Sequence, residues 1–248
     1  MPVPERWIRP PRPLGDRVRV LTTTREGGVS GGVYAGFNLA DHVGDDAAAV
    51  AENRRRLAAI TGVRNLHWLD QVHGCDVVRV SGAPDAVPPR ADAVWTQERG
   101  LGIAVLTADC LPVVIAERSG ALIAVAHAGW RGLVGGVLAA TVAQLPVAAS
   151  ECVAWLGPAI GPAAYEVGGD VAETVQALGP HAEGVLHPGK APGKFWFDLF
   201  LLARRELQRA GVGEVLSDQI CTVENTALYS YRRDGLTGRM ATVAWLAD

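Results

Sequence analysis

The chain has 248 residues, a length that suits one large domain or two small ones. Hydrophobic residues make up 49% of it and charged residues 20%, so it can bury a sizeable core, and extended disorder is excluded. A net charge of -3 gives no electrostatic basis for binding nucleic acid. No apolar run approaches the ~18 residues that cross a membrane. We therefore expect a globular protein without nucleic-acid or membrane partners.

The N-terminal stretch MPVPERWIRPPRPLGDRVRV is charged and rich in proline, and it lacks the apolar region of a signal peptide. The four cysteines form no CxxC pair and are too few for a disulfide framework. We expect a reduced, cytoplasmic protein. We also expect one domain over residues 1–248, with a short proline-rich segment at 1–16. No interface signature is apparent, so we expect a monomer.

In chain order, the first predicted element is a strand at residues 17–24. A glycine-rich segment follows it, too irregular for a helix or strand and too long for a plain turn, and ordered loops of this length are often functional. A helix then begins near Asp45 or Asp46, either of which can cap it.

Segments rich in β-branched or small apolar residues predict most of the remaining elements. Predicted strands lie at 66–80 (two short strands or one bent strand), 91–97, 101–110, 111–117, 121–129, 151–160, 218–225, 230–235 and 238–246. Predicted helices lie at 133–145, 168–178 and 197–211. Helices and strands are mixed and hairpins occur among them, so the pattern indicates an α/β or α+β fold with mixed sheets.

A hairpin turn is predicted between the strands at 111–117 and 121–129. A two-residue loop at 119–120 would place His127 opposite Pro112 and Cys110 opposite Gly129. Cys110 and His127 then share one face of the sheet as diagonal neighbours, roughly 7–8 Å apart at Cα. A register shifted by two would place them directly opposite, whereas a shift of one would put them on different faces.

His73, in the run QVHG, also follows a short apolar segment that we predict as a strand end. Two histidines and one cysteine at strand ends suit Zn²⁺ with one position left open, and Cu²⁺ accepts the same donors. A nucleophilic pair in which His127 activates Cys110 is the alternative. Each of these residues also has a purely structural explanation. A single cysteine in a strand is usually a small core residue, and a single histidine is usually a polar residue whose hydrogen bonds are made within the protein.

Seven motifs, in this order, resemble the multicopper-oxidase-like laccase-domain family. They are TTTREGGVS, FNLADHVGDD, QVHG, LTADCLPV, AHAGWRG, GPAIGPAAYEVG and SYRRDGLTGRMATVAWL. Members of that family are also described as polyphenol oxidase-like proteins, purine nucleoside phosphorylases and peptidoglycan editing factors. The resemblance extends from about Val18 to Leu246, and the combination of motifs is specific.

The resemblance implies a four-layer α/β/β/α sandwich with mixed sheets, and it implies that His73, Cys110 and His127 bind a metal ion. The implied activity is zinc-dependent phosphorolysis of adenosine, inosine, guanosine and methylthioadenosine, with adenosine deamination as a side activity. Phosphorolysis needs a site for phosphate as well as for the nucleoside.

Several further residues are candidates for that chemistry. Asp109, next to Cys110, could orient a histidine ligand or act as an acid or base, and Cys110 could itself be catalytic. Arg131, beside two glycines at a predicted helix start, is a candidate phosphate contact. The remaining candidates for substrate contacts are Arg25, Asn38 and Arg233.

Three other functions stay open from the sequence. A peptidoglycan-precursor editing amidase could use the same metal and would not need phosphate. A copper-dependent phenol oxidase must transfer electrons to O₂, which a single site of two histidines and one cysteine does poorly. A non-catalytic protein with a structural metal would normally have four protein ligands, and only three are evident.

Overall fold

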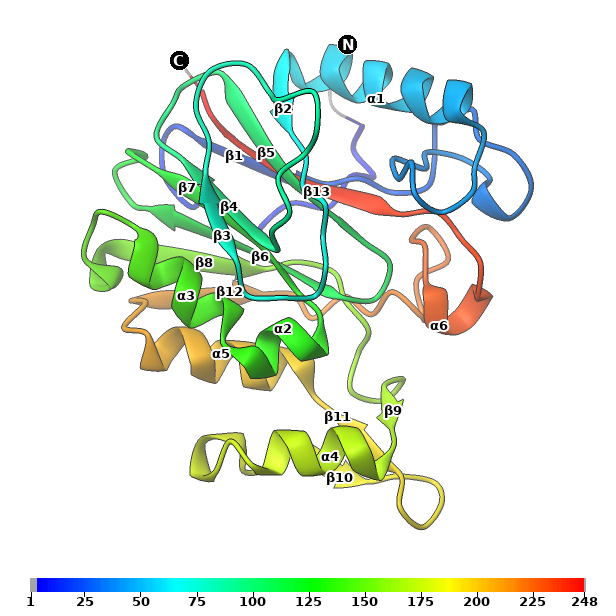
Figure 1. Cartoon of the computed structure of the whole chain (residues 1–248), viewed down its shortest axis with the longest axis vertical. Coiled ribbons are helices and arrows are strands. Elements are labelled where there is room, and N and C mark those ends of the chain that lie inside the picture. Colours follow the sequence, from blue (N-terminus) through cyan, green and yellow to red (C-terminus); the bar gives the residue numbers. More distant parts are fainter. Residues whose placement is uncertain (1–3, 248) are drawn as a thin grey trace.

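The computed structural model describes residues 4–247 and consists of two β-sheets packed face to face, with helices on their outer faces (Figure 1). The four-stranded sheet has the order β1-β13-β5-β2. Its strands are β1 (Val18–Thr22), β13 (Met240–Leu246), β5 (Leu101–Thr107) and β2 (Asn65–His67). β13 pairs antiparallel with both β1 and β5, whereas β2 pairs parallel with β5, so the sheet is mixed.

The six-stranded sheet has the order β12-β8-β6-β7-β4-β3 and is also mixed. Its strands are β12 (Glu214–Ser217), β8 (Cys152–Leu156), β6 (Leu111–Glu117), β7 (Ile123–Ala128), β4 (Ala93–Thr96) and β3 (Val77–Arg79). Both edge strands pair in parallel and the inner strands pair antiparallel. Pro112 lies opposite His127 on the β6–β7 hairpin, which confirms the register predicted from the turn.

Six α-helices accompany the sheets in the described part of the chain. They are α1 (Ala47–Thr61), α2 (Trp130–Gly135), α3 (Val137–Gln144), α4 (Gly169–Gln176), α5 (Leu199–Arg209) and α6 (Tyr231–Asp234). Short 3-10 turns occur at η1 (Gly32–Tyr34), η2 (Ala149–Glu151) and η3 (Pro180–Ala182). The Asp46 side chain accepts the N–H groups of Ala48 and Ala49, so the predicted cap of α1 is confirmed.

Three apolar clusters hold the layers together. Ile103 and Val125 belong to the cluster between the two sheets. Leu57 of α1 packs on the outer face of the four-stranded sheet, and Leu138 of α3 and Leu202 of α5 belong to the cluster on the outer face of the six-stranded sheet. Because the inner strands are covered on both faces, β5, β6 and β7 are buried along their whole length rather than at alternate positions.

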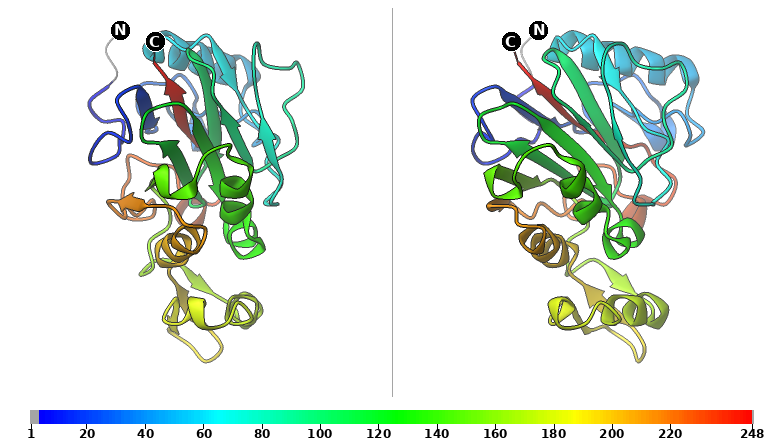
Figure 2. Two further views of the ribbon diagram at one scale, coloured as in Figure 1. Left: turned by 90° about the vertical axis from the view of Figure 1, so that its left-hand side faces the viewer. Right: turned by 60° about the vertical axis from the view of Figure 1, so that its left-hand side comes forward.

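A small lobe projects from one end of the sandwich (Figures 1 and 2). It contains α4 and an antiparallel sheet of β10 (Leu186–Pro188), β11 (Phe195–Phe197) and β9 (Glu166–Val167). Val171, Val175 and Phe197 are buried and continue the apolar cluster that contains α5. The lobe is therefore attached to the sandwich through a shared core.

The mixed α/β class predicted from the sequence is confirmed, but several element predictions are wrong. The predicted helix at 133–145 is two helices, because Gly136 takes a φ of 93° between them. The segment 230–235 is not a strand: Ser230 caps the short helix α6 instead. Residues 218–225 form only an isolated bridge, at Cys221. Within residues 4–247 no helix combines the length and the apolar character needed to span a bilayer.

Candidate functional site

His73, Cys110 and His127 come together from three separate segments. His127 lies on β7, and Cys110 immediately precedes β6. His73 was expected at a strand end, but it lies in the loop between β2 and β3 with a φ of 59°, a left-handed conformation that is uncommon outside glycine. Asp109, before Cys110, has a φ of 96°, so both turns that deliver a donor carry backbone strain.

The donor atoms of these three side chains all lie within 4.8 Å of one another. Nε2 of His73 is 3.8 Å from Sγ of Cys110, and the two imidazole rings meet edge to face with centroids 4.7 Å apart. A Cβ atom on Gly129 would lie 2.9 Å from His73 and 3.0 Å from Cys110, so only glycine leaves room for this cluster. The chain thus concentrates two nitrogen donors and one sulfur donor at a single point.

Asp92, immediately before β4, holds two of the donors in place and was not singled out in the sequence. Its carboxylate is fully buried and accepts the Nδ1–H of His127 at 2.8 Å. It also accepts the backbone N–H groups of Val72, His73 and Gly74 at 3.1, 2.9 and 2.6 Å. One carboxylate therefore fixes the loop of His73 and leaves Nε2 of His127 free to bind a ligand.

The electrostatics of the cluster favour a thiolate beside an imidazolium. Burial opposes ionisation of Cys110, but the charges of His127 and His73 and the hydrogen bonds from them outweigh it and lower the pKa of the thiol to about 6. Burial also opposes protonation of His127, but the Cys110 and Asp92 charges raise its pKa to about 9. Deprotonated sulfur is the form that binds metals and attacks electrophiles.

The cluster fits a zinc ion. Tetrahedral zinc with bonds of ~2.0–2.3 Å separates its nitrogen and sulfur donors by about 3.6 Å, close to the 3.8 Å between His73 and Cys110. Two histidines and one thiolate are a common zinc donor set, and the described residues supply no fourth donor to the cluster. An ion held here would keep one coordination position open.

That open side faces a cavity of about 540 Å³, the size of a small-molecule site. Three aromatic rings, of Trp130, Tyr165 and Tyr231, line it together with the donor cluster. Asp109 and Arg131, two of the residues predicted from the sequence, also line the cavity. Its walls thus combine stacking surfaces with polar groups.

Asp109 does not contact either histidine, so the orienting role considered for it belongs to Asp92. One oxygen of the Asp109 carboxylate accepts the hydroxyl hydrogen of Thr222 at 2.6 Å. The other accepts the backbone N–H of Arg232 at 2.6 Å. Asp109 therefore links the donor cluster to the C-terminal segment, which contributes Tyr231, Arg232 and Arg239 to the cavity lining.

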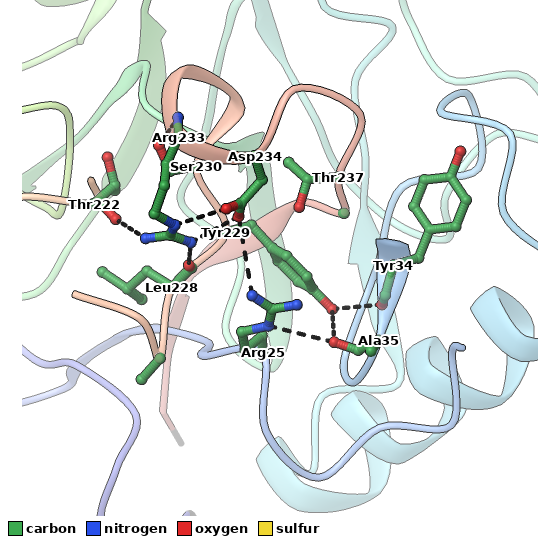
Figure 3. Close-up of polar contacts among 12 residues, drawn as sticks. Arg25, Tyr34, Ala35, Thr222, Leu228, Tyr229, Ser230, Arg233, Asp234 and Thr237 are labelled. Carbon is green, nitrogen blue, oxygen red and sulfur yellow. Dashed lines mark hydrogen bonds and ion pairs between the residues drawn. The ribbon is translucent and has the colours of Figure 1, made fainter. Parts of the chain in front are cut away.

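The structure places Arg25 and Arg233 outside the cavity lining, in a network between the glycine-rich loop and the C-terminal segment (Figure 3). Arg233 donates to the carbonyl oxygens of Thr222 and Leu228 at 2.8 and 2.7 Å, and it pairs with Asp234. Arg25 donates to a backbone carbonyl and lies over a tyrosine ring. Both side chains hold loops rather than face the cavity.

Asn38 is fully buried and likewise lies outside the cavity lining. Its amide nitrogen donates to the Ala40 carbonyl and to Asp45, and its oxygen accepts the backbone N–H groups of Ala40 and Arg239. The side chain is thus engaged in holding the glycine-rich loop against the segment before β13. Arg239, which follows in that segment, does line the cavity.

The chain is similar to a family of known proteins over nearly its whole length. The model of the family described as multi-copper polyphenol oxidoreductase laccase matches residues 19–247, nearly the whole chain. The chain belongs to this family. The motif resemblance is therefore confirmed, and all three donor residues lie inside the matched part.

Family members that resemble this chain align over almost their full length. A Pseudomonas aeruginosa protein named purine nucleoside phosphorylase PA4543 is 48% identical over 98% of this chain and 99% of its own. The Escherichia coli protein named purine nucleoside phosphorylase YfiH is 44% identical over 95% of this chain and 96% of its own. The crystal structure of Neisseria meningitidis protein NMB0706 superposes with a TM-score of 0.91 at 42% identity, covering 98% of this chain and 100% of that one.

Proposed function

We propose that this protein is a zinc-dependent purine nucleoside phosphorylase. Its substrates would be adenosine, inosine, guanosine and methylthioadenosine, with adenosine deamination as a side activity. The observation that carries the proposal is the three-donor cluster, which opens into a cavity lined by both aromatic rings and arginine. Two relatives at 48% and 44% identity bear the name purine nucleoside phosphorylase, which supports the same activity here.

His73, Cys110 and His127 would hold the zinc ion, with copper as the alternative metal. The bound ion would act as a Lewis acid and lower the pKa of water at its open position, which is the chemistry that deamination of a purine requires. Asp92 would keep the His127 ring oriented toward the ion through their 2.8 Å hydrogen bond.

The remaining roles belong to side chains of the cavity wall. The rings of Trp130, Tyr165 and Tyr231 offer flat apolar surfaces for a purine base. Arg131 would bind phosphate through charge-assisted hydrogen bonds. Asp109 would donate or accept the proton that moves when the base leaves, and its contacts with Thr222 and Arg232 would keep it in place.

We also propose that the chain acts as a single domain, a four-layer α/β/β/α sandwich over residues 1–248, and as a cytoplasmic monomer. The order of the packed layers supports the sandwich. All four cysteines are free, which suits a reducing compartment.

The test is to incubate zinc-quantified protein with adenosine, with and without phosphate, and to separate adenine, hypoxanthine and inosine by chromatography. Adenine that forms only with phosphate, and not in the Cys110→Ala variant, supports the phosphorylase. Inosine formed without phosphate would make deamination the main reaction. No product from fully metallated protein would overturn the proposal, and peptidoglycan precursors would then be the next substrates to test.

A further inference from the structure

Three arginines converge on the cavity that holds Cys110, although only one of them was considered as a substrate contact from the sequence. Arg131, Arg232 and Arg239 all line this cavity. Each guanidinium lies over an aromatic ring of the same wall: Arg131 over Trp130 at 4.5 Å, Arg232 over Tyr165 at 5.2 Å and Arg239 over Tyr231 at 6.0 Å. A ring beneath a guanidinium restricts its motion and leaves its edge free to donate hydrogen bonds.

None of the three has a carboxylate partner among the described residues, although arginines elsewhere in the fold commonly do. Asp109 is the one acidic residue of the described lining, and both of its oxygens already accept hydrogen bonds. Three guanidinium groups therefore face one carboxylate, inside a chain whose net charge is -3. Positive charge gathered in a cleft attracts anionic ligands.

Arg239 is the most deeply placed of the three and is held by its surroundings. Its Nη1 donates to the carbonyl oxygens of Thr237 and Gly238 at 2.8 and 3.1 Å, and Asn38 accepts its backbone N–H at 2.9 Å. Within residues 4–247, Nε and Nη2 donate to no protein acceptor. Burial lowers the pKa of Arg239, so an anion in the cavity would relieve the cost of keeping this guanidinium charged.

The other two arginines are exposed and lie at the rim of the cavity. Nη1 of Arg232 donates to the Glu166 carbonyl oxygen at 2.9 Å, which positions the side chain between α6 and the small lobe. Arg131 makes no hydrogen bond to the described residues, and its guanidinium lies over the Trp130 ring. One deep arginine and two rim arginines therefore surround the same opening. This arrangement suits a compact anion with several oxygen atoms, because each arginine can donate to a different oxygen.

We infer that Arg131, Arg232 and Arg239 together form a phosphate-binding site in the cavity beside Cys110. The ligand is a phosphoryl group, supplied either by inorganic phosphate or by a phosphorylated nucleoside. In the first case the inference rests on the proposed function and assigns the residues that bind its second substrate. Arg232 and Arg239 thereby take the place of Arg25 and Arg233, whose guanidinium groups are engaged in holding loops.

The site is tested by titrating zinc-loaded protein with inorganic phosphate in a calorimeter, which requires no turnover. We expect Arg239→Gln and Arg232→Gln to weaken phosphate binding about ten- to a hundredfold each, the effect of losing a hydrogen bond to a charged group. Arg239→Lys should give an intermediate loss of phosphate affinity, because lysine keeps the positive charge but lacks the planar guanidinium that donates two parallel hydrogen bonds. Arg79→Gln is the matched control, since Arg79 lies over the Trp95 ring at 5.1 Å and away from the cavity.

The outcomes separate this site from the proposed activity. Phosphate binding within twofold of wild type in Arg239→Gln and Arg232→Gln overturns the inference, even where adenosine is phosphorolysed. Phosphate binding that both variants lose supports the site, even where no nucleoside is cleaved and the proposed function fails. If Arg239→Gln does not fold, Arg131→Gln replaces it, because that side chain makes no hydrogen bond that the described fold needs.

A second titration identifies the source of the phosphoryl group. A phosphorylated nucleoside is supported as the ligand if the wild-type protein binds adenosine 5′-monophosphate more tightly than adenosine and Arg232→Gln abolishes that difference. Equal affinities for adenosine and adenosine 5′-monophosphate, together with phosphate binding that depends on the arginines, support inorganic phosphate as the ligand. No binding of either phosphate ligand to the wild-type protein overturns the site.

Discussion

Nδ1 of His127 lies 2.8 Å from Oδ1 of Asp92, and the same buried carboxylate binds the backbone around His73. Two histidines that are 54 positions apart in the sequence are therefore positioned by one side chain. Because all four donors to Asp92 are N–H groups, the site is built for a charged, acceptor-only carboxylate. This relationship makes Asp92 the residue whose substitution should affect the metal site without removing a ligand.

Asp92→Asn should weaken zinc binding by about 10- to 100-fold, the usual effect of losing the partner of a histidine ligand. The amide would turn one N–H donor toward the N–H groups that the carboxylate now accepts. Zinc affinity is measured by competition with a chelator of known affinity. Asp76→Asn, an exposed neighbour, is the control. Unchanged zinc affinity in Asp92→Asn would show that the carboxylate does not support the metal site.

In metal-free protein, Cys110 should react with iodoacetamide far faster than the other cysteines near pH 7. Its pKa of about 6 lies below the ordinary thiol value of ~8.5, so the reactive thiolate forms as the pH rises through 6 and is abundant at 7. Burial raises the pKa of Cys152 to about 11, and the pKa of Cys75 is raised as well. Mass spectrometry after timed alkylation from pH 5 to 9 gives the profile of each thiol. A Cys110 midpoint above 8 would contradict the thiolate–imidazolium pair.

Gly129→Ala should abolish tight zinc binding while the protein stays folded. The added methyl group would lie 2.9 Å from His73 and 3.0 Å from Cys110, closer than carbon atoms approach such neighbours, so the donors must move apart. Gly31→Ala is the control, because its Cβ would meet nothing within 4 Å and its φ of -113° is open to alanine. Metal content and circular dichroism are measured on both. Full zinc content in Gly129→Ala would count against the cluster as the metal site.

Asp109→Asn and Thr222→Val separate a catalytic role of Asp109 from a structural one. Thr222→Val removes the 2.6 Å hydrogen bond between these residues and keeps the carboxylate, whereas Asp109→Asn removes the charge and keeps an amide that can still hydrogen-bond to Thr222. If Asp109 transfers a proton, its substitution should lower kcat by about 10²- to 10⁴-fold, and Thr222→Val should lower it by less than about tenfold. Equal losses in the two variants would assign Asp109 a structural role. The pH profile of kcat provides a second readout.

Arg233→Gln should destabilise the fold by about 2–4 kcal/mol, because it leaves several backbone carbonyls without their charged donor. The free energy of unfolding is measured by urea denaturation, with the exposed Arg64→Gln as control. Since Arg233 does not line the cavity, phosphate binding by the folded variant should remain within a few-fold of wild type. Unchanged stability together with lost phosphate binding would instead favour the role first considered for Arg233 from the sequence.

Local patterns determined a large part of this protein. The turn at 119–120 and the two-residue period of strands placed Pro112 opposite His127, as the structure has them. A short polar residue before an apolar helix narrowed the cap to Asp45 or Asp46, and the structure has it at Asp46. Such features depend on neighbours in the chain, and hydrogen bonding within a turn or cap is the same in any fold.

Contacts between distant segments were decided only by the tertiary structure. Asp92 is a single acidic residue before a strand, and nothing local shows that its carboxylate is buried between two histidines. Arg232 and Arg233 are a second example. The Arg232 side chain lines the cavity, whereas the neighbouring Arg233 side chain donates to backbone carbonyl oxygens. A long, flexible arginine side chain can do either. The contacts of the C-terminal segment with Asp109 and with the glycine-rich loop select the outcome.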